Sequence, residues 1–142
     1  MCLSKIDKKF ADNDKVIKGY QIKAKYNDGK YGSVYRFTSF YSDYPSNRIP
    51  RKKWVKDKED DFITSKSDDE YRTGYHIFSN KKGLKRFFSD SIVIQDELEI
   101  VFVKVLGRNV TTKGLQSKIG KHSNVYVCRE IKILKEIKEN AL

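Results

Sequence analysis

The chain has 142 residues, of which 38% are hydrophobic and 13% aromatic. It is therefore too apolar for a disordered protein, and it is long enough for one hydrophobic core but not for two. Thirty Lys and Arg against nineteen Asp and Glu give a net charge of +11, which favours anionic partners such as nucleic acids and nucleotides and disfavours cationic ones. Because the lysines are spread along the whole chain, a surface that only aids solubility explains the charge about as well. We predict a single ligand-binding domain over residues 1–142.

The two cysteines, Cys2 and Cys128, have no second Cys or His nearby at a spacing that suits a metal. The first ten residues lack the apolar core of a signal peptide, and no stretch approaches the roughly 20 apolar residues that cross a bilayer. We therefore expect free thiols, no metal or cofactor, no membrane contact and a cytoplasmic protein.

A hairpin is the first predicted element. From Val16 to Tyr26, apolar and polar residues alternate, which places Lys23 and Lys25 on the solvent face of a half-buried strand. The turn residues 27–30 follow, and residues 31–37 resume an extended pattern. Residues from about Thr38 to Asp69 hold both prolines and blocks of charge, which predict a long irregular excursion with a short strand near residues 53–55.

The second half of the chain reads as strand, helix and two strands. Residues 71–78 form the first strand, Ser79 or Asn80 caps a helix whose apolar stripe includes Leu84, and its opposite face carries Lys81, Lys82, Lys85 and Arg86. A two-sided strand over residues 99–106 ends at Gly107, and a Gly- and Lys-rich connection precedes the last strand, residues 124–134. These elements predict an α+β fold, a mainly antiparallel sheet of about five or six strands with one main helix.

Arg129 is the main anomaly of the last strand. Alternation places it on the same face as Val127 and Ile131, where a guanidinium must either pair with a carboxylate such as Glu130 or face a cavity. A one-residue bulge would instead turn it into water. Arg36 has a similar setting: its fork can hold a phosphate while the neighbouring Tyr35 covers a base or a sugar, although an edge-strand arginine in solvent fits the same pattern.

Two further segments carry candidate ligand-binding residues. Tyr75, His76 and Phe78 follow a glycine that would allow a ligand to approach the backbone closely, although a lone strand histidine is more often structural. Arg108 and Asn109 stand at the predicted end of a buried strand, where a cation and an amide could read a phosphate and a base edge. Gly-Arg-Asn is also an ordinary turn.

The sequence lacks the motifs of common enzymes. It has no phosphate-cradling GxxxxGK[S/T] or GxGxxG loop, no HExxH and no GxSxG elbow. His76 with a distant carboxylate could still act as an acid and a base. We predict a binding protein rather than an enzyme.

The succession of Met1-Cys2-Leu3, Ser33-Val34-Tyr35-Arg36, Gly74-Tyr75-His76-Ile77-Phe78 and Arg129-Glu130-Ile131-Lys132-Ile133-Leu134 resembles the first family of phage Thoeris anti-defence proteins. Members of that family sequester, without degrading them, the cyclic ADP-ribose isomers made by TIR-domain enzymes of bacterial defence. They assemble as dimers and hexamers, and some bind cyclic oligonucleotides at separate sites.

The resemblance therefore implies a homo-oligomeric sponge for a cyclic ADP-ribose isomer in the host cytoplasm. By position, Arg36 and Arg129 match the cations of the family, and Asn109 lies where a base-reading amide would suit. The excursion over residues 38–69 departs from the shorter loop of the family. A basic nucleic-acid-binding phage protein is the alternative, and it predicts a steep dependence of binding on salt.

Overall fold

The computed structural model describes residues 3–33, 48–91, 99–118, 121–138 and 141. Its elements are nine strands and one helix within these residues: β1 (Lys5–Ile6), β2 (Ile17–Lys25), β3 (Tyr31–Ser33), β4 (Trp54–Lys56), β5 (Phe62–Thr64), β6 (Glu70–Arg72), β7 (Tyr75–Phe78), α1 (Lys81–Ser91), β8 (Glu99–Lys118) and β9 (Lys121–Ile137).

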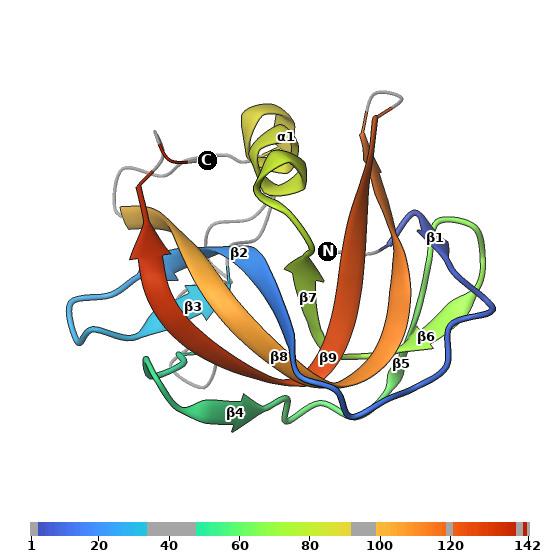
Figure 1. Ribbon diagram of the computed structural model, residues 1–142, viewed down its shortest axis with the longest axis horizontal. Coiled ribbons are helices and arrows are strands. Elements are labelled where there is room, and N and C mark those ends of the chain that lie inside the picture. Colours follow the sequence, from blue (N-terminus) through green and yellow to red (C-terminus); the bar gives the residue numbers. More distant parts are fainter. Residues whose placement is uncertain (1–2, 34–47, 92–98, 119–120, 139–140, 142) are drawn as a thin grey trace.

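Two long antiparallel strands, β8 and β9, form the frame of the molecule. They pair over nearly their whole length, and their hairpin curves strongly, as Figure 1 shows. Strand β2 lies along the other edge of β8, while β7 and β4 lie along the other edge of β9. Because β2 also meets β7 through Tyr20 and Phe78, the pairings of β8, β2, β7 and β9 close into a ring.

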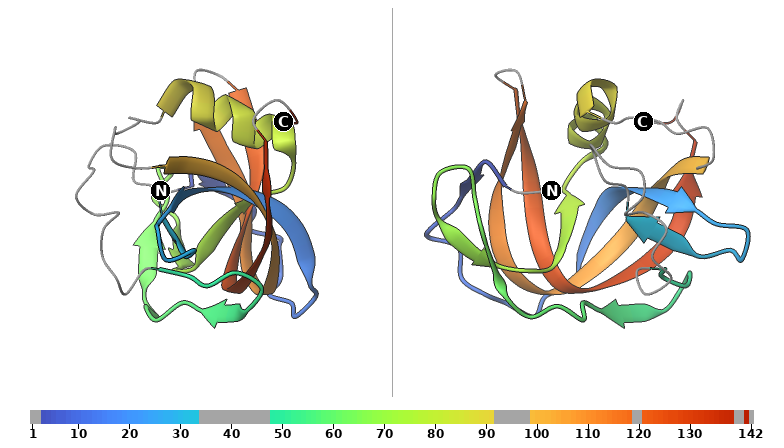
Figure 2. Two further views of the ribbon diagram at one scale, coloured as in Figure 1. Left: turned by 90° about the vertical axis from the view of Figure 1, so that its left-hand side faces the viewer. Right: turned by 180° about the vertical axis from the view of Figure 1, so that it is seen from behind.

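The remaining strands and the helix lie around this ring. Strand β3 pairs with β2, and β1 pairs with the second half of β8. Strands β5 and β6 form a separate two-stranded sheet. Figure 2 shows that α1 lies over one end of the curved sheet, next to β7 and β9.

The predicted α+β fold is wrong: the described chain is mostly β, with a seven-stranded sheet, a two-stranded sheet and one helix of 11 residues. The cause is the length of β8 and β9, which have 20 and 17 residues. We had expected β8 to end at Gly107, but it continues to Lys118.

Gly107 marks close packing rather than a strand end. A Cβ at this position would lie 2.6 Å from both the Cys128 Sγ and the Ile77 Cδ1. Asn109, two residues later, has a φ of 54°, and the register shifts between Val110 and Thr112, which is a bulge inside the continuous strand. The sequence signals of a turn are thus those of a bent, crowded strand.

The predicted hairpin is confirmed where the structure describes it, since β2 pairs with β3. Residues 34–37 of its second strand lie outside the described residues, and the prediction for one face of β2 is wrong. Strand β2 covers most of the predicted range, but Gln21 and Lys23 are buried, with 6% and 3% exposure. Both faces of β2 are covered, because Ile17 packs against one part of the core while Tyr20 and Ile22 pack against the other. Of the excursion, residues 38–47 lie outside the described residues, and the remainder contains the expected short strand as β4 and the additional strand β5.

The core has two adjoining parts. One gathers around Ile77, Val103, Cys128 and Ile131, and the other lies under α1 around Phe78, Leu84 and Val125. The helix buries Leu84 completely, so this residue of the predicted apolar stripe faces the sheet.

Gly19 tests the closure of the ring, because a Cβ there would lie 1.9 Å from the Ile77 Cγ2 and 2.8 Å from the Phe78 carbonyl oxygen. Gly19→Ala is expected to lower the free energy of unfolding by about 3 kcal/mol, the upper end of overpacking effects. Ile77→Ala should cost roughly 2–5 kcal/mol on its own. The double variant, measured by urea denaturation, should lose less than the sum, because Ile77→Ala removes the clashing methyl group. Additive losses would contradict this packing.

Candidate anion-binding site

The N-terminus of helix α1 has a capping residue, but its first two N–H groups have no hydrogen-bond partner in the described chain. The Asn80 side-chain oxygen accepts the Gly83 N–H at 2.8 Å, which confirms Asn80 as the N-cap. Among the described residues, nothing accepts a hydrogen bond from the N–H groups of Lys81 and Lys82, the first two of the helix. These groups point out of the helix end and are free to bind an acceptor.

The charges at this helix end oppose its dipole. The first turn has no acidic residue and instead begins with Lys81 and Lys82. Each cation at a helix N-terminus costs about 0.3–1 kcal/mol, whereas an anion there is stabilising by a similar amount. A bound anion would therefore remove an unfavourable arrangement and satisfy the two free N–H groups.

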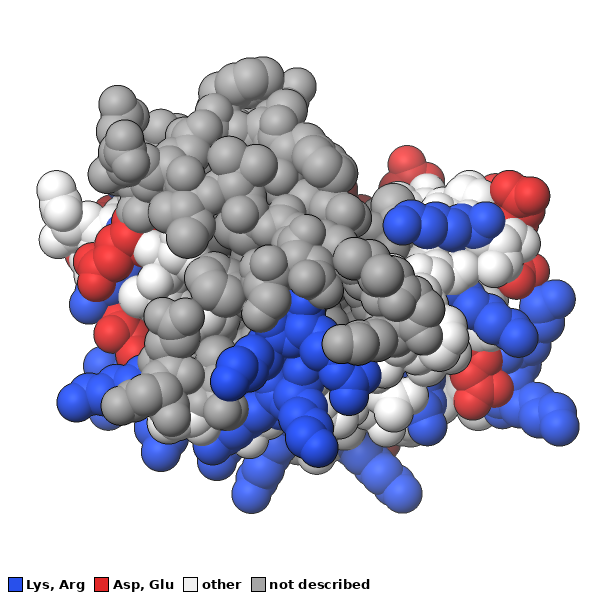
Figure 3. Space-filling view, turned by 90° about the horizontal axis from the view of Figure 1, so that it is seen from above, with Lys and Arg blue, Asp and Glu red and all other residues white. Residues whose placement is uncertain are grey.

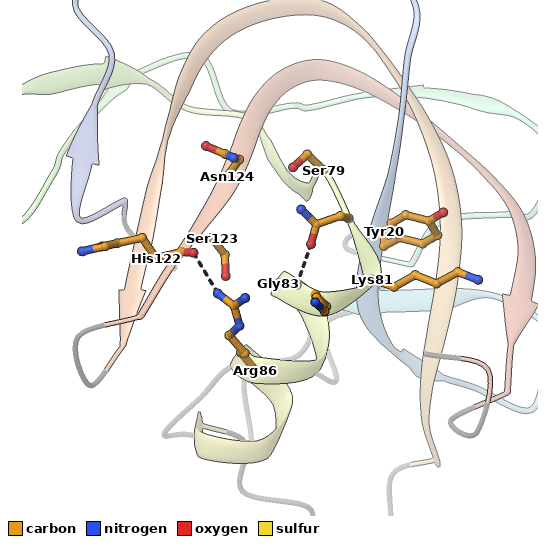
Figure 4. A pocket seen from close by; sticks show the side chains of 10 residues that line it. Tyr20, Ser79, Lys81, Gly83, Arg86, His122, Ser123 and Asn124 are labelled. Carbon is orange, nitrogen blue, oxygen red and sulfur yellow. Dashed lines mark hydrogen bonds between the residues drawn. The ribbon is translucent and has the colours of Figure 1, made fainter.

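A hollow of about 430 Å³ opens beside this helix end. It lies between the first turns of α1, the β7–α1 turn at Ser79 and Asn80, and the start of β9 at residues 122–124, as Figure 4 shows. Arg86, from the second turn of α1, crosses to β9 and donates a hydrogen bond from Nη1 to the His122 carbonyl oxygen at 3.0 Å. The guanidinium is thereby held at the wall of the hollow.

Ser123 supplies a buried polar group to the same hollow. Its residue is only 8% exposed, and its hydroxyl has no hydrogen-bond partner among the described residues. In Figure 4 the hydroxyl points toward the first turns of α1. A Cβ on Gly83 would lie 2.9 Å from the Ser123 Cβ, so glycine is what allows α1 to approach β9 here. The hydroxyl oxygen is not fully enclosed, so it can hydrogen-bond a ligand in the hollow.

The wider surface around α1 is also basic. Figure 3 shows the face that carries α1, on which described Lys and Arg side chains lie at the centre and along much of the border, while Asp and Glu lie toward the sides. With a net charge of +11, this field attracts anions and raises their rate of encounter.

Arg129 confirms the expectation that a guanidinium on this face must be paired, but its partner is not Glu130. It is 4% exposed. Its Nη1 donates to the Thr73 carbonyl oxygen at 2.6 Å, its Nη2 donates to the Asp57 carbonyl oxygen at 3.0 Å, and the Asp57 carboxylate lies 3.7 Å away. Arg129 thus ties two distant loops to β9.

Arg108 and Asn109 form a surface cluster with Glu130 and Trp54. Arg108 binds both carboxylate oxygens of Glu130 at 3.1 Å and stacks 4.1 Å from the centre of the Trp54 ring. Asn109 also donates to Glu130. The hydrogen bond from Arg108 is the main reason that the pKa of Glu130 lies below its ordinary value. This cation already has its carboxylate.

The three β7 candidates point into the fold. Phe78 is buried in the core under α1. Tyr75 packs against the other part of the core, and burial raises the pKa of its hydroxyl to about 12. His76 bonds through Nε2 to the Tyr71 hydroxyl at 2.9 Å, and burial lowers its pKa to about 3. Tyr35 and Arg36 lie outside the described residues.

The predicted residues are thus not gathered in one place within the described chain, and none of them lines the hollow. The sequence did show the basic face of the helix and its cap. What it could not show is that Ser123 and Asn124, about 40 residues further along, lie opposite that helix end.

Metal-binding groups and membrane-spanning helices are both absent from the part of the chain that the structure describes. The described residues hold no group of three or more His, Cys, Asp or Glu placed to bind a metal ion. Of the helical residues described, none belongs to a segment long and apolar enough to cross a membrane.

Comparisons with known proteins return no match to a family model, a curated protein or a solved structure.

Proposed function

We propose that the protein binds a phosphorylated small molecule in the hollow beside α1 and holds it without cleaving it. The observation that carries this proposal is a helix N-terminus with two free N–H groups and two lysines, facing the unpartnered hydroxyl of Ser123, a residue that is 8% exposed. Phosphate is the anion that such helix ends bind most readily. Binding and retention require neither a nucleophile nor a metal.

The ligand that we propose is a nucleotide of the cyclic ADP-ribose type. Its pyrophosphate carries the charge that Lys81, Lys82 and Arg86 would neutralise. The choice of this nucleotide depends on the resemblance to the Thoeris anti-defence family and not on the hollow itself. On this proposal the protein acts in the host bacterial cytoplasm as a homo-oligomer that removes the signal of a TIR enzyme, and cyclic oligonucleotides are candidate ligands of a second site.

Reversing the charge at the start of α1 should have opposite effects on stability and on ligand binding. Lys81→Glu with Lys82→Glu should raise the free energy of unfolding of the ligand-free protein by about 1 kcal/mol, because the carboxylates suit the helix dipole. The same variant should lose binding of a cyclic ADP-ribose isomer in a calorimetric titration. The wild-type protein should gain about 2.7 kcal/mol of stability at a ligand concentration 100 times Kd. Ligand released by heating should be chemically intact.

Lys15→Glu with Lys58→Glu is the matched control, since it changes the net charge equally at two exposed positions. It should keep binding within about twofold at a fixed salt concentration. Equal loss in both variants would show that the overall charge, and not the hollow, attracts the ligand. Binding of pyrophosphate but not of the cyclic nucleotide would retain the site and reject this nucleotide as its ligand.

A further inference from the structure

The hollow has a neutral polar side as well as a cationic one. Ser79, Ser123 and Asn124 line it, and their side chains form no hydrogen bond within the described chain. Their oxygen atoms can accept hydrogen bonds. Their O–H and N–H groups can also donate. A phosphate dianion can use only these donors, whereas a sugar hydroxyl can both donate to these side chains and accept from them.

Gln116 has an unpaired acceptor beside Ser123, but it does not line the hollow itself. It stands directly opposite Ser123 in the β8–β9 ladder, so both side chains project from the same face of the sheet. Gln116 is 5% exposed, and its Oε1 has no hydrogen-bond donor among the described groups. Two neighbouring buried side chains on this face therefore have unused hydrogen-bonding capacity, and an unsatisfied acceptor is costly.

The size and the lining of the hollow limit what could supply these donors. At about 430 Å³ it is within the range of small-molecule sites and larger than an inorganic anion requires. Its lining residues include two rings, Tyr20 and His122, and the His122 ring is hydrogen-bonded to the Ser117 hydroxyl. The lining therefore suits hydroxyl groups better than it suits a base stacked on both faces.

We propose that this site recognises the sugar phosphate part of its ligand, with the phosphate at the N-terminus of α1 and the sugar hydroxyls donating to Ser123 and Asn124. The inference rests on the proposed function, because it assigns the ligand class of the same hollow. A nucleotide would then be held by its ribose phosphate, and its base would lie at the open side.

Ribose 5-phosphate and methyl phosphate test the inference, since both are phosphate monoesters and only the first has sugar hydroxyls. In calorimetric titrations of the wild-type protein, ribose 5-phosphate should bind about tenfold more tightly. Ser123→Ala should reduce this preference to within about twofold, because the affinity for ribose 5-phosphate should fall more than the affinity for methyl phosphate. Asn124→Ala, at an exposed position, should weaken the same preference, and urea denaturation should show that both variants fold.

The remaining outcomes separate the two proposals. Equal binding of both esters by the wild-type protein, or an equal loss of both in Ser123→Ala, would overturn sugar recognition and leave an anion site that depends on Lys81 and Lys82. Failure of the wild-type protein to bind either ester, or any cyclic ADP-ribose isomer, would overturn the proposed function and the inference together.

Discussion

Lowering the pH from 7 to 4 is expected to remove about 3 kcal/mol of stability through His76 alone. Burial holds the pKa of this imidazole at about 3, against an ordinary value of 6.5, although a hydrogen bond to the Gly74 backbone opposes the shift. Between about pH 3 and pH 6.5, His76 is therefore neutral in the folded protein and protonated in the unfolded chain. The contribution of His76 is complete above pH 6.5 and is lost progressively as the pH falls toward 3.

The hydrogen bonds around His76 explain why its neutral form fits. The Tyr71 hydroxyl accepts the Leu3 N–H at 2.9 Å, so its own hydrogen is available to the His76 Nε2, also at 2.9 Å. The tautomer with hydrogen on Nδ1 satisfies these groups. Protonation of Nε2 would make this nitrogen a donor, so the Tyr71 hydroxyl could no longer donate to it and would have to turn, which would disturb the anchoring of the N-terminal segment.

His76→Gln is the test, because a Gln side-chain oxygen can accept from Tyr71 while the group no longer titrates. The difference in unfolding free energy between the wild-type protein and the variant, measured with urea at each pH, should shrink by about 3 kcal/mol between pH 7 and pH 4. His122→Gln, at an exposed position, is the control. A constant difference across this range would show that His76 does not stay neutral in the folded protein.

The strands were easier to predict than the way in which they fold together. Alternation located β2, β7 and most of β9, since a period of two follows directly from strand geometry. The same reasoning stopped β8 at Gly107, because a glycine between polar residues resembles a turn. Glycine is required at this position because Ile77 and Cys128, which are distant in sequence, pack closely against it.

The candidate site shows the same division between local and distant information. The Asn80 cap and the basic start of α1 are local features, and both were visible in the sequence. Ser123 and Gln116 acquire meaning only when β8 and β9 pair and α1 packs over them. Arg129 was recognised as anomalous, but its partners Asp57 and Thr73 lie in loops that no periodicity locates.

Lys23 is buried, although the strand pattern predicts that it is exposed, and its burial is energetically unfavourable. Alternation placed it in water, yet it is 3% exposed, and no carboxylate of the described chain lies within salt-bridge distance. Its amine lies 5.8 Å from the centre of the Tyr75 ring. Burial lowers its pKa to about 8, from an ordinary value of 10.5. At neutral pH a charged amine is therefore held in the interior at a cost.

Lys23→Met is expected to stabilise the protein by about 2 kcal/mol at pH 7. The full pKa difference corresponds to about 3 kcal/mol, and the lost contact with the Tyr75 ring offsets roughly 1 kcal/mol of it. The gain should fade as the pH rises from 8 to 10.5, because the wild-type amine is then neutral in the folded protein and ever more so in the unfolded chain. Urea denaturation at several pH values measures this directly.

Lys25→Met is the matched control on the same strand and should have the opposite sign. Its amine forms an ion pair with Glu136 at 2.9 Å, and the hydrogen bond to Glu136 raises its pKa, so removing it should lower stability at pH 7. A loss of stability in Lys23→Met as well would contradict an unpaired buried charge. A gain confined to Lys23 would show that this strand tolerates a destabilising residue, which is the pattern expected where a residue is kept for a reason other than stability.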